Sequence, residues 1–238
     1  MSVPGPTGPI EAVLFDLYGT LVPEYSKVDF YASVAAMAEA VGGEIDAFRA
    51  GWDATARARQ TGGFATVEDN VRAVCGDLGL TPSDLAIERG LAPRAAMYRR
   101  WFHPRVGAIE TLSALGSRGY RIALVSMCAP DTPALWHTTE LAALVDAEVF
   151  SCETGLRKPE PAIYLEAASR LGVSADRCVY VGDGAYGELT GAAAVGMHPY
   201  LLVDPELDHA AMLTPERDAW DGATIADLRD VLAFLPGR

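Results

Sequence analysis

Lysine is almost absent from this chain of 238 residues. Of its 19 basic residues, only Lys27 and Lys158 are lysine, and the rest are arginine. The chain therefore uses arginine wherever a generic positive charge suffices. A lysine kept at one position favours a role for a compact ammonium group there. We expect such a role for Lys158, whereas chance explains an exposed Lys27.

Cysteine pairs and long apolar runs are missing as well. Cys75, Cys128, Cys152 and Cys178 are scattered without a C-x-x-C pair, which argues against a zinc site and a disulfide framework. No apolar run approaches the length that spans a membrane. Residues 1–9 are Gly/Pro-rich and lack the pattern of a signal peptide, so we expect a flexible leader on a cytoplasmic protein.

Acidic residues outnumber basic residues in this chain. The formal net charge is −13 at pH 7, which disfavours nonspecific binding to nucleic acid. The same charge repels phosphate substrates at long range, so a phosphate site must be built from local cations. Hydrophobic residues make up 50% of the chain, which is enough for a large core. The charge predicts a soluble protein and indicates no oligomeric state.

One stretch organises the chain: Ala12-Val13-Leu14-Phe15-Asp16-Leu17-Tyr18-Gly19-Thr20-Leu21. Its short apolar run predicts a strand buried on both faces, with Asp16 where the strand ends. A carboxylate is expensive to bury unless it is paired, hydrogen-bonded or bound to a metal. Taken alone, Asp16 is explained equally well as a carboxylate that only caps the next turn.

A helical region follows this strand. Apolar residues have helical spacing over 28–41 and 45–59, and a capping box at Thr66 predicts the start of a third helix. Thr81-Pro82 is typical of the start of a fourth helix, which runs toward Phe102. Residues 23–105 are therefore predicted to be an all-helical insertion.

Strands and helices alternate after residue 106. Strands are expected at 121–125, 148–150, 178–181 and 200–203, and helices at 107–117, 132–143, 160–171, 189–195 and 225–234. This alternation predicts an α/β fold, a doubly wound Rossmann-like parallel sheet with helices on both faces. The expected core comprises residues 10–22 and 106–238.

Polar side chains follow the predicted strands. Asp16, Ser126 and Asp183 come where strands end, and Lys158 lies in the loop after the third strand of the predicted sheet, 148–150. Ligands of open parallel sheets bind at the carboxyl ends of the strands, so these four side chains are expected at one edge. Each has a simple structural explanation, such as a helix cap for Ser126, but four at successive strand ends favour a shared site.

Phosphoryl transfer is the chemistry that this set suits. Asp16 and Asp183 can hold Mg²⁺, which prefers oxygen ligands, and Asp16 can attack phosphorus to form an aspartyl-phosphate. Ser126 and loop amides would hold phosphoryl oxygens, and Lys158 would neutralise charge on the transferring group. Glu188 would order a metal-bound water or brace Lys158, unless it is only an exposed glutamate in a first helical turn.

The sequence resembles the haloacid dehalogenase (HAD) superfamily of hydrolases at four motifs in order. They are Asp16 to Thr20, Val125-Ser126, Lys158-Pro159, and Gly182-Asp183 through Glu188. The helical insertion resembles the family's C1-type cap, which closes over the substrate.

The resemblance implies roles for these residues. Asp16 is expected to be the nucleophile and a metal ligand, together with Asp183 and the backbone carbonyl of Tyr18. Thr20 is expected at the phosphate with Ser126 and Lys158.

Tyr18 departs from the pattern of the family's phosphatases. Those enzymes usually carry a second aspartate there, which protonates the leaving group and later activates water. A tyrosine hydroxyl titrates near pH ~10 and is a poor base at neutral pH. Glu24, Tyr25 and His103, near the predicted ends of the cap, are candidates for a replacement.

Alternative functions follow from this departure. Tyrosine at this position also occurs in the family's metal-independent 2-haloacid dehalogenases, which resemble Ser-Ser-Asn where this chain has Gly182-Asp183-Gly184. We therefore predict a magnesium-dependent phosphatase first and a dehalogenase second. A phosphonate-cleaving hydrolase needs a cap lysine, which Lys27 matches poorly. A non-catalytic phosphate-binding protein is the alternative from another class.

The cap sets specificity in this family. Arg57 and Arg59 are candidates to reach a substrate hydroxyl or a second anion, although a solvated helical face explains each as well. Closure over a small edge predicts a small phosphorylated metabolite, such as a sugar phosphate or a biosynthetic intermediate. Neither nucleic acid nor a membrane is expected as a partner.

Overall fold

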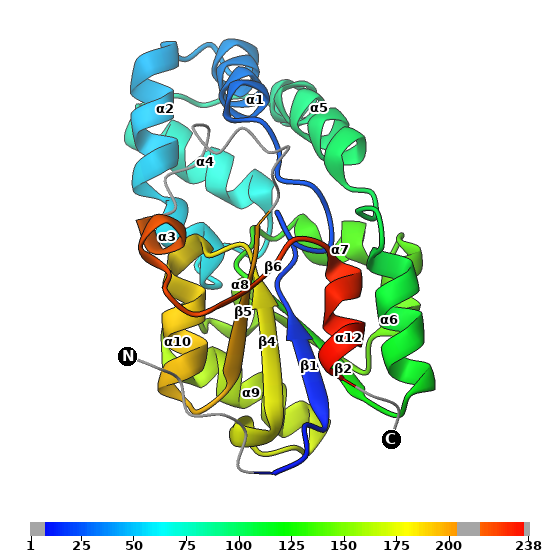
Figure 1. Cartoon of the computed structure of the whole chain (residues 1–238). Helices are drawn as coiled ribbons and strands as arrows, with labels where there is room; N and C mark the ends of the chain where they lie inside the picture. Colours follow the sequence, from blue (N-terminus) through cyan, green and yellow to red (C-terminus); the bar gives the residue numbers. More distant parts are fainter. Residues whose placement is uncertain (1–7, 204–214, 236–238) are drawn as a thin grey trace.

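The computed structural model describes residues 8–203 and 215–235, which form a sheet covered by helices and a group of helices at one end of it (Figure 1). Most of the expected leader therefore lies outside the described residues. No helix in the described part of the chain is long and apolar enough to cross a membrane.

The sheet has six parallel strands in the order β3-β2-β1-β4-β5-β6. The strands are β1 (Ala12–Phe15), β2 (Arg121–Ser126), β3 (Ala147–Phe150), β4 (Cys178–Gly182), β5 (His198–Leu202) and β6 (Ala223–Ile225). The central strand β1 pairs with β2 on one side and with β4 on the other. The predicted doubly wound parallel sheet is confirmed.

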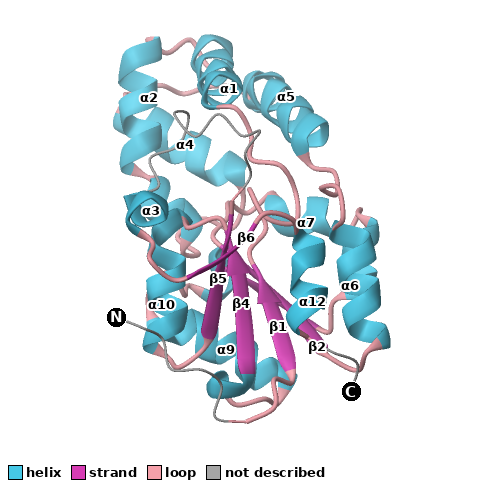
Figure 2. Cartoon of the chain, in the orientation of Figure 1, coloured by secondary structure: helices cyan, strands magenta, loops and turns pink. Residues whose placement is uncertain are grey.

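Helices lie on both sides of the sheet (Figure 2), and alternate residues of each strand face opposite sides of it. Phe15 of β1 belongs to an apolar cluster with Leu112 of α6 (Ala108–Ser117) and Val231 of α12 (Val231–Phe234). Leu14 belongs to a second cluster with Tyr164 of α9 (Pro161–Leu171) and Leu189 of α10 (Glu188–Ala194). Burial on both faces explains why these strands are continuous apolar runs.

Five helices lie between β1 and α6 in the chain, and we refer to them as the cap. They are α1 (Lys27–Ala40), α2 (Ile45–Ala54), α3 (Ala56–Gln60), α4 (Val67–Asp77) and α5 (Asp84–Trp101). Four of them, α1, α2, α4 and α5, contribute to an apolar cluster that includes Met37, Phe48 and Trp52. The predicted capping box is present, because Thr66 and Asp69 each accept a backbone hydrogen bond from the other.

Several predicted boundaries are wrong for local reasons. The helix expected over 45–59 breaks at Thr55, whose hydroxyl donates to the carbonyls of Gly51 and Trp52. Ser83 rather than Thr81 caps α5, and its hydroxyl accepts a hydrogen bond from the amide of Ala86.

The segments 132–143 and 225–234 also differ from their expected single helices. The first contains α7 (Thr132–Trp136) and the 3₁₀ helix η1 (Glu140–Leu144). The second begins with the end of β6, followed by η5 (Leu228–Asp230) and α12, because Ile225 pairs with Leu202 at the sheet edge. The remaining elements are α8 (Ser151–Thr154), η2 (Ala175–Arg177), η3 (Ala185–Gly187) and α11 (Pro215–Ala219).

Truncation of Phe48 is expected to destabilise the cap. Its ring is fully buried and stacks on Trp52 at a centroid distance of 6.5 Å. We expect Phe48→Ala to lower the free energy of unfolding by about 3–5 kcal/mol, measured by urea denaturation. Val28→Ala is the control, because Val28 is 78% exposed, and it should change that free energy by less than about 0.5 kcal/mol. Equal losses in both variants would contradict the packing described.

Candidate active site

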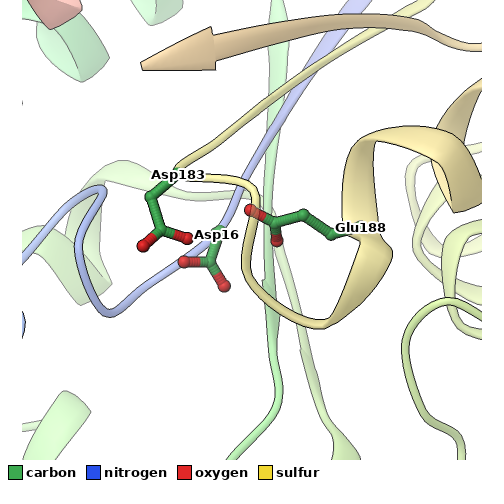
Figure 3. Close-up of side chains that lie close together, drawn as sticks. All are labelled: Asp16, Asp183 and Glu188. Carbon is green, nitrogen blue, oxygen red and sulfur yellow. The ribbon is translucent and has the colours of Figure 1, made fainter. Parts of the chain in front are cut away.

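The register of the sheet brings Asp16 and Asp183 to the same edge. Phe15 pairs with Leu124 of β2 and with Val181 of β4, so Asp16 and Asp183 leave neighbouring strands at nearly the same level. The amide of Asp16 donates a 2.9 Å hydrogen bond to the carbonyl of Val181. Figure 3 shows the carboxylates of both residues close together, with that of Glu188 beside them.

Lys158 reaches this edge from the loop between α8 and α9. Its Nζ lies 2.5 Å from Oδ1 of Asp16 and 2.6 Å from Oε2 of Glu188, and its side chain is buried. Burial favours the neutral amine, but the two carboxylates outweigh it and hold the pKa of Lys158 above its usual value. Lys158 is therefore a fixed cation that positions Asp16.

Glu188 is fully buried at the start of α10 and holds Lys158 in place. Its carboxylate accepts hydrogen bonds from Lys158, from the hydroxyl of Tyr180 at 2.7 Å and from the amide of Gly184 at 3.0 Å. These contacts suit a residue that holds Lys158 in position, which is one of the two roles expected for Glu188. Tyr180, which sequence reasoning missed, is a buried residue of β4 and gave no signal apart from its aromatic type.

Two glycines allow the carboxylates to come this close. A Cβ atom on Gly182 would lie 2.0 Å from Oε1 of Glu188, and one on Gly19 would lie 2.6 Å from Oδ2 of Asp183. Gly19 also has a φ of +78°, a conformation that side chains disfavour. Glycine at these positions is therefore a requirement of the site.

Negative charge is in excess at this edge. Three buried carboxylates share one ammonium, and one oxygen of each lies within 4.8 Å of the others. Burial raises the pKa of Asp16 to about 7, and Lys158 limits that rise. Burial and the charge of Asp16 raise the pKa of Asp183 to about 6. A cation at Asp16 and Asp183 would relieve this repulsion, so the donor set fits a hard, oxygen-preferring divalent ion.

Two hydroxyls at the edge have unused hydrogen-bonding capacity. Thr20 and Ser126 are fully buried, and neither side-chain oxygen has a hydrogen-bond partner within residues 8–203 and 215–235. Buried polar groups are normally paired, so these two favour a ligand that supplies the missing acceptor. This placement suits the phosphate-binding role expected for both residues, which stays a prediction, as does the metal-binding role of the Tyr18 carbonyl.

The Tyr18 side chain faces the cap, and its hydroxyl stays protonated at neutral pH. Its hydroxyl lies 2.9 Å from that of Thr132, and burial raises its pKa well above the usual value. Its ring packs against Tyr25, Tyr98 and Phe102, with centroids 5.4–6.2 Å apart. The residue that replaces the family's second aspartate is thus part of an aromatic wall.

The three candidates for the missing acid occupy different environments. His103 is exposed. Tyr25 packs on Tyr18, and burial raises its pKa well above the usual value. Burial and the charges of Asp183 and Asp16 raise the pKa of Glu24 well above its usual value. Of the three candidates, Glu24 is the carboxyl group whose raised pKa favours a bound proton.

The two arginines singled out in the cap point in different directions. A pocket lies between the cap and the core. Arg57 is exposed, lies 4.0 Å from Glu160 and does not line this pocket. Arg59 is buried and lines that pocket. Arg94 lines it too and was missed, although a signal existed: it shares the buried face of α5 with Ile87, Gly90 and Met97.

A model of the haloacid dehalogenase-like hydrolase family matches residues 10–196. The chain belongs to this family of hydrolases. The match covers the cap and all four predicted motifs, so the resemblance inferred from the motifs is confirmed.

Relatives of this hydrolase include phosphatases and dehalogenases. It is 30% identical to ribulose-1,5-bisphosphate 5-phosphatase of Halopiger xanaduensis, over 93% of this chain and 99% of that protein. It is 26% identical to (S)-2-haloacid dehalogenase 4A of Burkholderia cepacia, over 79% of this chain and 81% of that one.

Other relatives match over less of their length. The glyceraldehyde 3-phosphate phosphatase of Methanothermobacter thermautotrophicus is 30% identical over 56% of this chain, which corresponds to 58% of that enzyme and thus less than two thirds. Among solved structures, an HAD phosphatase from Thermococcus onnurineus has a TM-score of 0.66 at 21% identity, over 96% of this chain and 99% of that one. At this identity the likeness concerns the fold alone.

Gly182→Ala is expected to disrupt the edge where Asp16, Asp183 and Glu188 meet. The new methyl group would overlap the Glu188 carboxylate and displace the brace of Lys158. We expect a stability loss of about 1–3 kcal/mol or more, measured by urea denaturation. Gly116→Ala is the matched control, because this helical glycine has no atom within 4 Å of an added Cβ, and it should be neutral or stabilising by up to about 1 kcal/mol. A neutral Gly182→Ala would contradict the close packing.

Proposed function

We propose that this hydrolase is a magnesium-dependent phosphatase that acts on a small phosphorylated metabolite. The observation that carries the proposal is the pair of buried aspartates, Asp16 and Asp183, beside a lysine that neutralises only part of their charge. The names of two relatives, a glyceraldehyde 3-phosphate phosphatase and a ribulose-1,5-bisphosphate 5-phosphatase, support the substrate class.

Asp16 is the nucleophile in the proposed reaction. One of its carboxylate oxygens attacks phosphorus as the bond to the leaving oxygen breaks, and water then hydrolyses the aspartyl-phosphate. Lys158 binds Oδ1 of Asp16 at 2.5 Å, which leaves Oδ2 for the attack or for the metal. The hydroxyls of Thr20 and Ser126 donate to the phosphoryl oxygens, and Lys158 offsets their charge.

Asp16 and Asp183 would hold Mg²⁺ together with the Tyr18 carbonyl. The ion would offset the repulsion between an anionic nucleophile and an anionic substrate. Glu188 stays out of the metal shell in this proposal, because Lys158, Tyr180 and Gly184 already occupy its oxygens.

Dehalogenation is the competing function. The relative named a haloacid dehalogenase and the tyrosine at position 18 favour it. Asp183 favours phosphatase chemistry instead, since a second buried carboxylate within 4.8 Å of Asp16 supplies an oxygen ligand that a metal-independent reaction does not need.

The reaction class is tested with enzyme from which metal has been removed by EDTA. We expect release of phosphate from p-nitrophenyl phosphate only after Mg²⁺ is added, and no chloride release from 2-chloropropionate. Asp16→Asn should lower phosphate release by roughly a thousandfold or more, with the fold checked by circular dichroism. Metal-independent chloride release would replace the proposal with dehalogenation. Binding of phosphate without either reaction would favour the non-catalytic alternative.

The dependence on the leaving group tests Glu24 as the source of the leaving-group proton. We expect Glu24→Gln to lower kcat by roughly 100-fold for an alkyl phosphate, such as glycerol phosphate. The loss should be much smaller for p-nitrophenyl phosphate, because nitrophenolate leaves without a proton. Glu39→Gln, on the exposed face of α1, is the control. Equal losses for both substrates would exclude this role for Glu24.

A further inference from the structure

A pocket of 220 Å³ lies between the cap and the core, next to the catalytic edge. Its core side includes Tyr18, two residues after Asp16, and Met127, directly after Ser126. Its cap side includes Arg59 and Arg94. A phosphate bound at the catalytic edge would therefore have the rest of its molecule in this pocket.

Aromatic rings form much of the pocket wall. Tyr18, Tyr25 and Tyr98 contact one another with centroids 5.4–6.2 Å apart, and Phe30 stacks on Tyr25 at 5.7 Å. Rings held by such mutual contacts form a rigid surface that suits a flat or apolar body.

Arg94 presents one unused donor in this pocket. Its side chain is 2% exposed, its Nε and Nη2 bind Asp131, and Nη2 also binds the hydroxyl of Tyr98 at 3.0 Å. Nη1 is buried and has no hydrogen-bond partner among the residues that the structure describes. Buried guanidinium nitrogens are costly to leave unpaired, so this one points to an acceptor supplied by a ligand.

Arg59 adds a positive charge to the same pocket. Its guanidinium lies 3.9 Å above the Trp52 ring, and Nη1 donates to the Trp52 carbonyl and to Asn70. It has no carboxylate within salt-bridge distance among the described residues. Burial and the charge of Arg94 lower the pKa of Arg59 to about 10, so it stays charged at neutral pH and the two arginines repel each other.

Lys27 also lines the pocket, whereas the one acidic residue of the lining, Asp53, is exposed and lies 3.9 Å from Arg49. In a chain with a net charge of −13, a buried pair of arginines in an aromatic pocket is a local exception. An anion there would relieve the repulsion between the arginines and accept the hydrogen bond from Arg94.

We propose that the substrate carries a second anionic group, a carboxylate or another phosphate, which binds Nη1 of Arg94 next to Arg59. The aromatic rings of Tyr18, Tyr25 and Tyr98 hold the body that connects it to the transferred phosphate. This inference rests on the proposed function and makes Arg94 and Arg59 residues that determine specificity.

Matched aryl phosphates test the second anionic group. 4-Carboxyphenyl phosphate carries it, and 4-carbamoylphenyl phosphate has nearly the same shape without the charge. We expect kcat/KM to favour the carboxylate by roughly 10- to 100-fold, the range for one charge-assisted hydrogen bond. The bisphosphate of hydroquinone identifies the preferred anion. Its two equivalent phosphates double kcat/KM by themselves, so a kcat/KM more than twice that of 4-carboxyphenyl phosphate indicates that the second anionic group is a phosphate.

Variants of Arg94 and Arg59 test whether these arginines cause the preference for the charged substrate. Arg94→Gln and Arg59→Gln should each bring the ratio of kcat/KM for charged and neutral substrates close to one, mainly through KM. Arg59→Gln serves if Arg94→Gln does not fold, because Arg94 also binds Asp131. Arg89→Gln, exposed on the same helix as Arg94, should keep the wild-type ratio. Equal use of charged and neutral substrates by the wild type, or a preference that survives in both variants, would overturn the proposal.

Calorimetry separates this proposal from the proposed reaction. 4-Hydroxybenzoate should bind the wild-type protein more tightly than 4-hydroxybenzamide, and Arg94→Gln and Arg59→Gln should remove the difference. Absence of phosphate release from all substrates would reject the phosphatase, while tighter binding of 4-hydroxybenzoate would still support the anion site. Equal binding of the two ligands would reject the anion site.

Discussion

The buried ammonium of Lys158 is the constraint on which the edge with Asp16 and Asp183 depends. It contacts Asp16, which follows β1, and Glu188, the first residue of α10, at 2.5 and 2.6 Å. Without this cation, both carboxylates would remain buried without a counter-ion, at a cost of about 3–5 kcal/mol. The parallel sheet, the glycines at 19 and 182 and the hydrogen bond from Tyr180 all serve to place charges around this one group.

The sequence was sufficient to predict the central strands of the sheet, because buried parallel strands are continuous apolar runs. It also predicted the edge with Asp16 and Asp183, because these residues directly follow two of these strands. Contacts within the cap were harder to predict. Arg57 and Arg59 looked equivalent, yet one faces solvent and the other lies above Trp52. Residues two positions apart on a helix point about 160° away from each other, because each residue turns the helix by about 100°. Only the packing of α3 decides which of the two is buried.

Predicted helix boundaries were wrong where short-range hydrogen bonds competed with the helical spacing of apolar residues. Thr55 and Ser83 each bind nearby backbone groups, which ends one helix and starts another a few residues from the predicted positions. The strand β6 has three residues, and pairing with β5 rather than an alternating pattern makes it a strand. Tertiary contacts of this kind leave little trace in a local sequence pattern.

Arg94 joins two parts of the molecule, since it belongs to α5 of the cap and its carboxylate partner, Asp131, lies in the core. The same side chain lines the pocket, and its Nη1 has no hydrogen-bond partner among the described residues. A ligand that engages this nitrogen would bind the closed arrangement of cap and core more tightly than an open one, and by thermodynamic linkage it would hold the cap shut. Recognition of the substrate and exclusion of water during the reaction would then depend on one side chain.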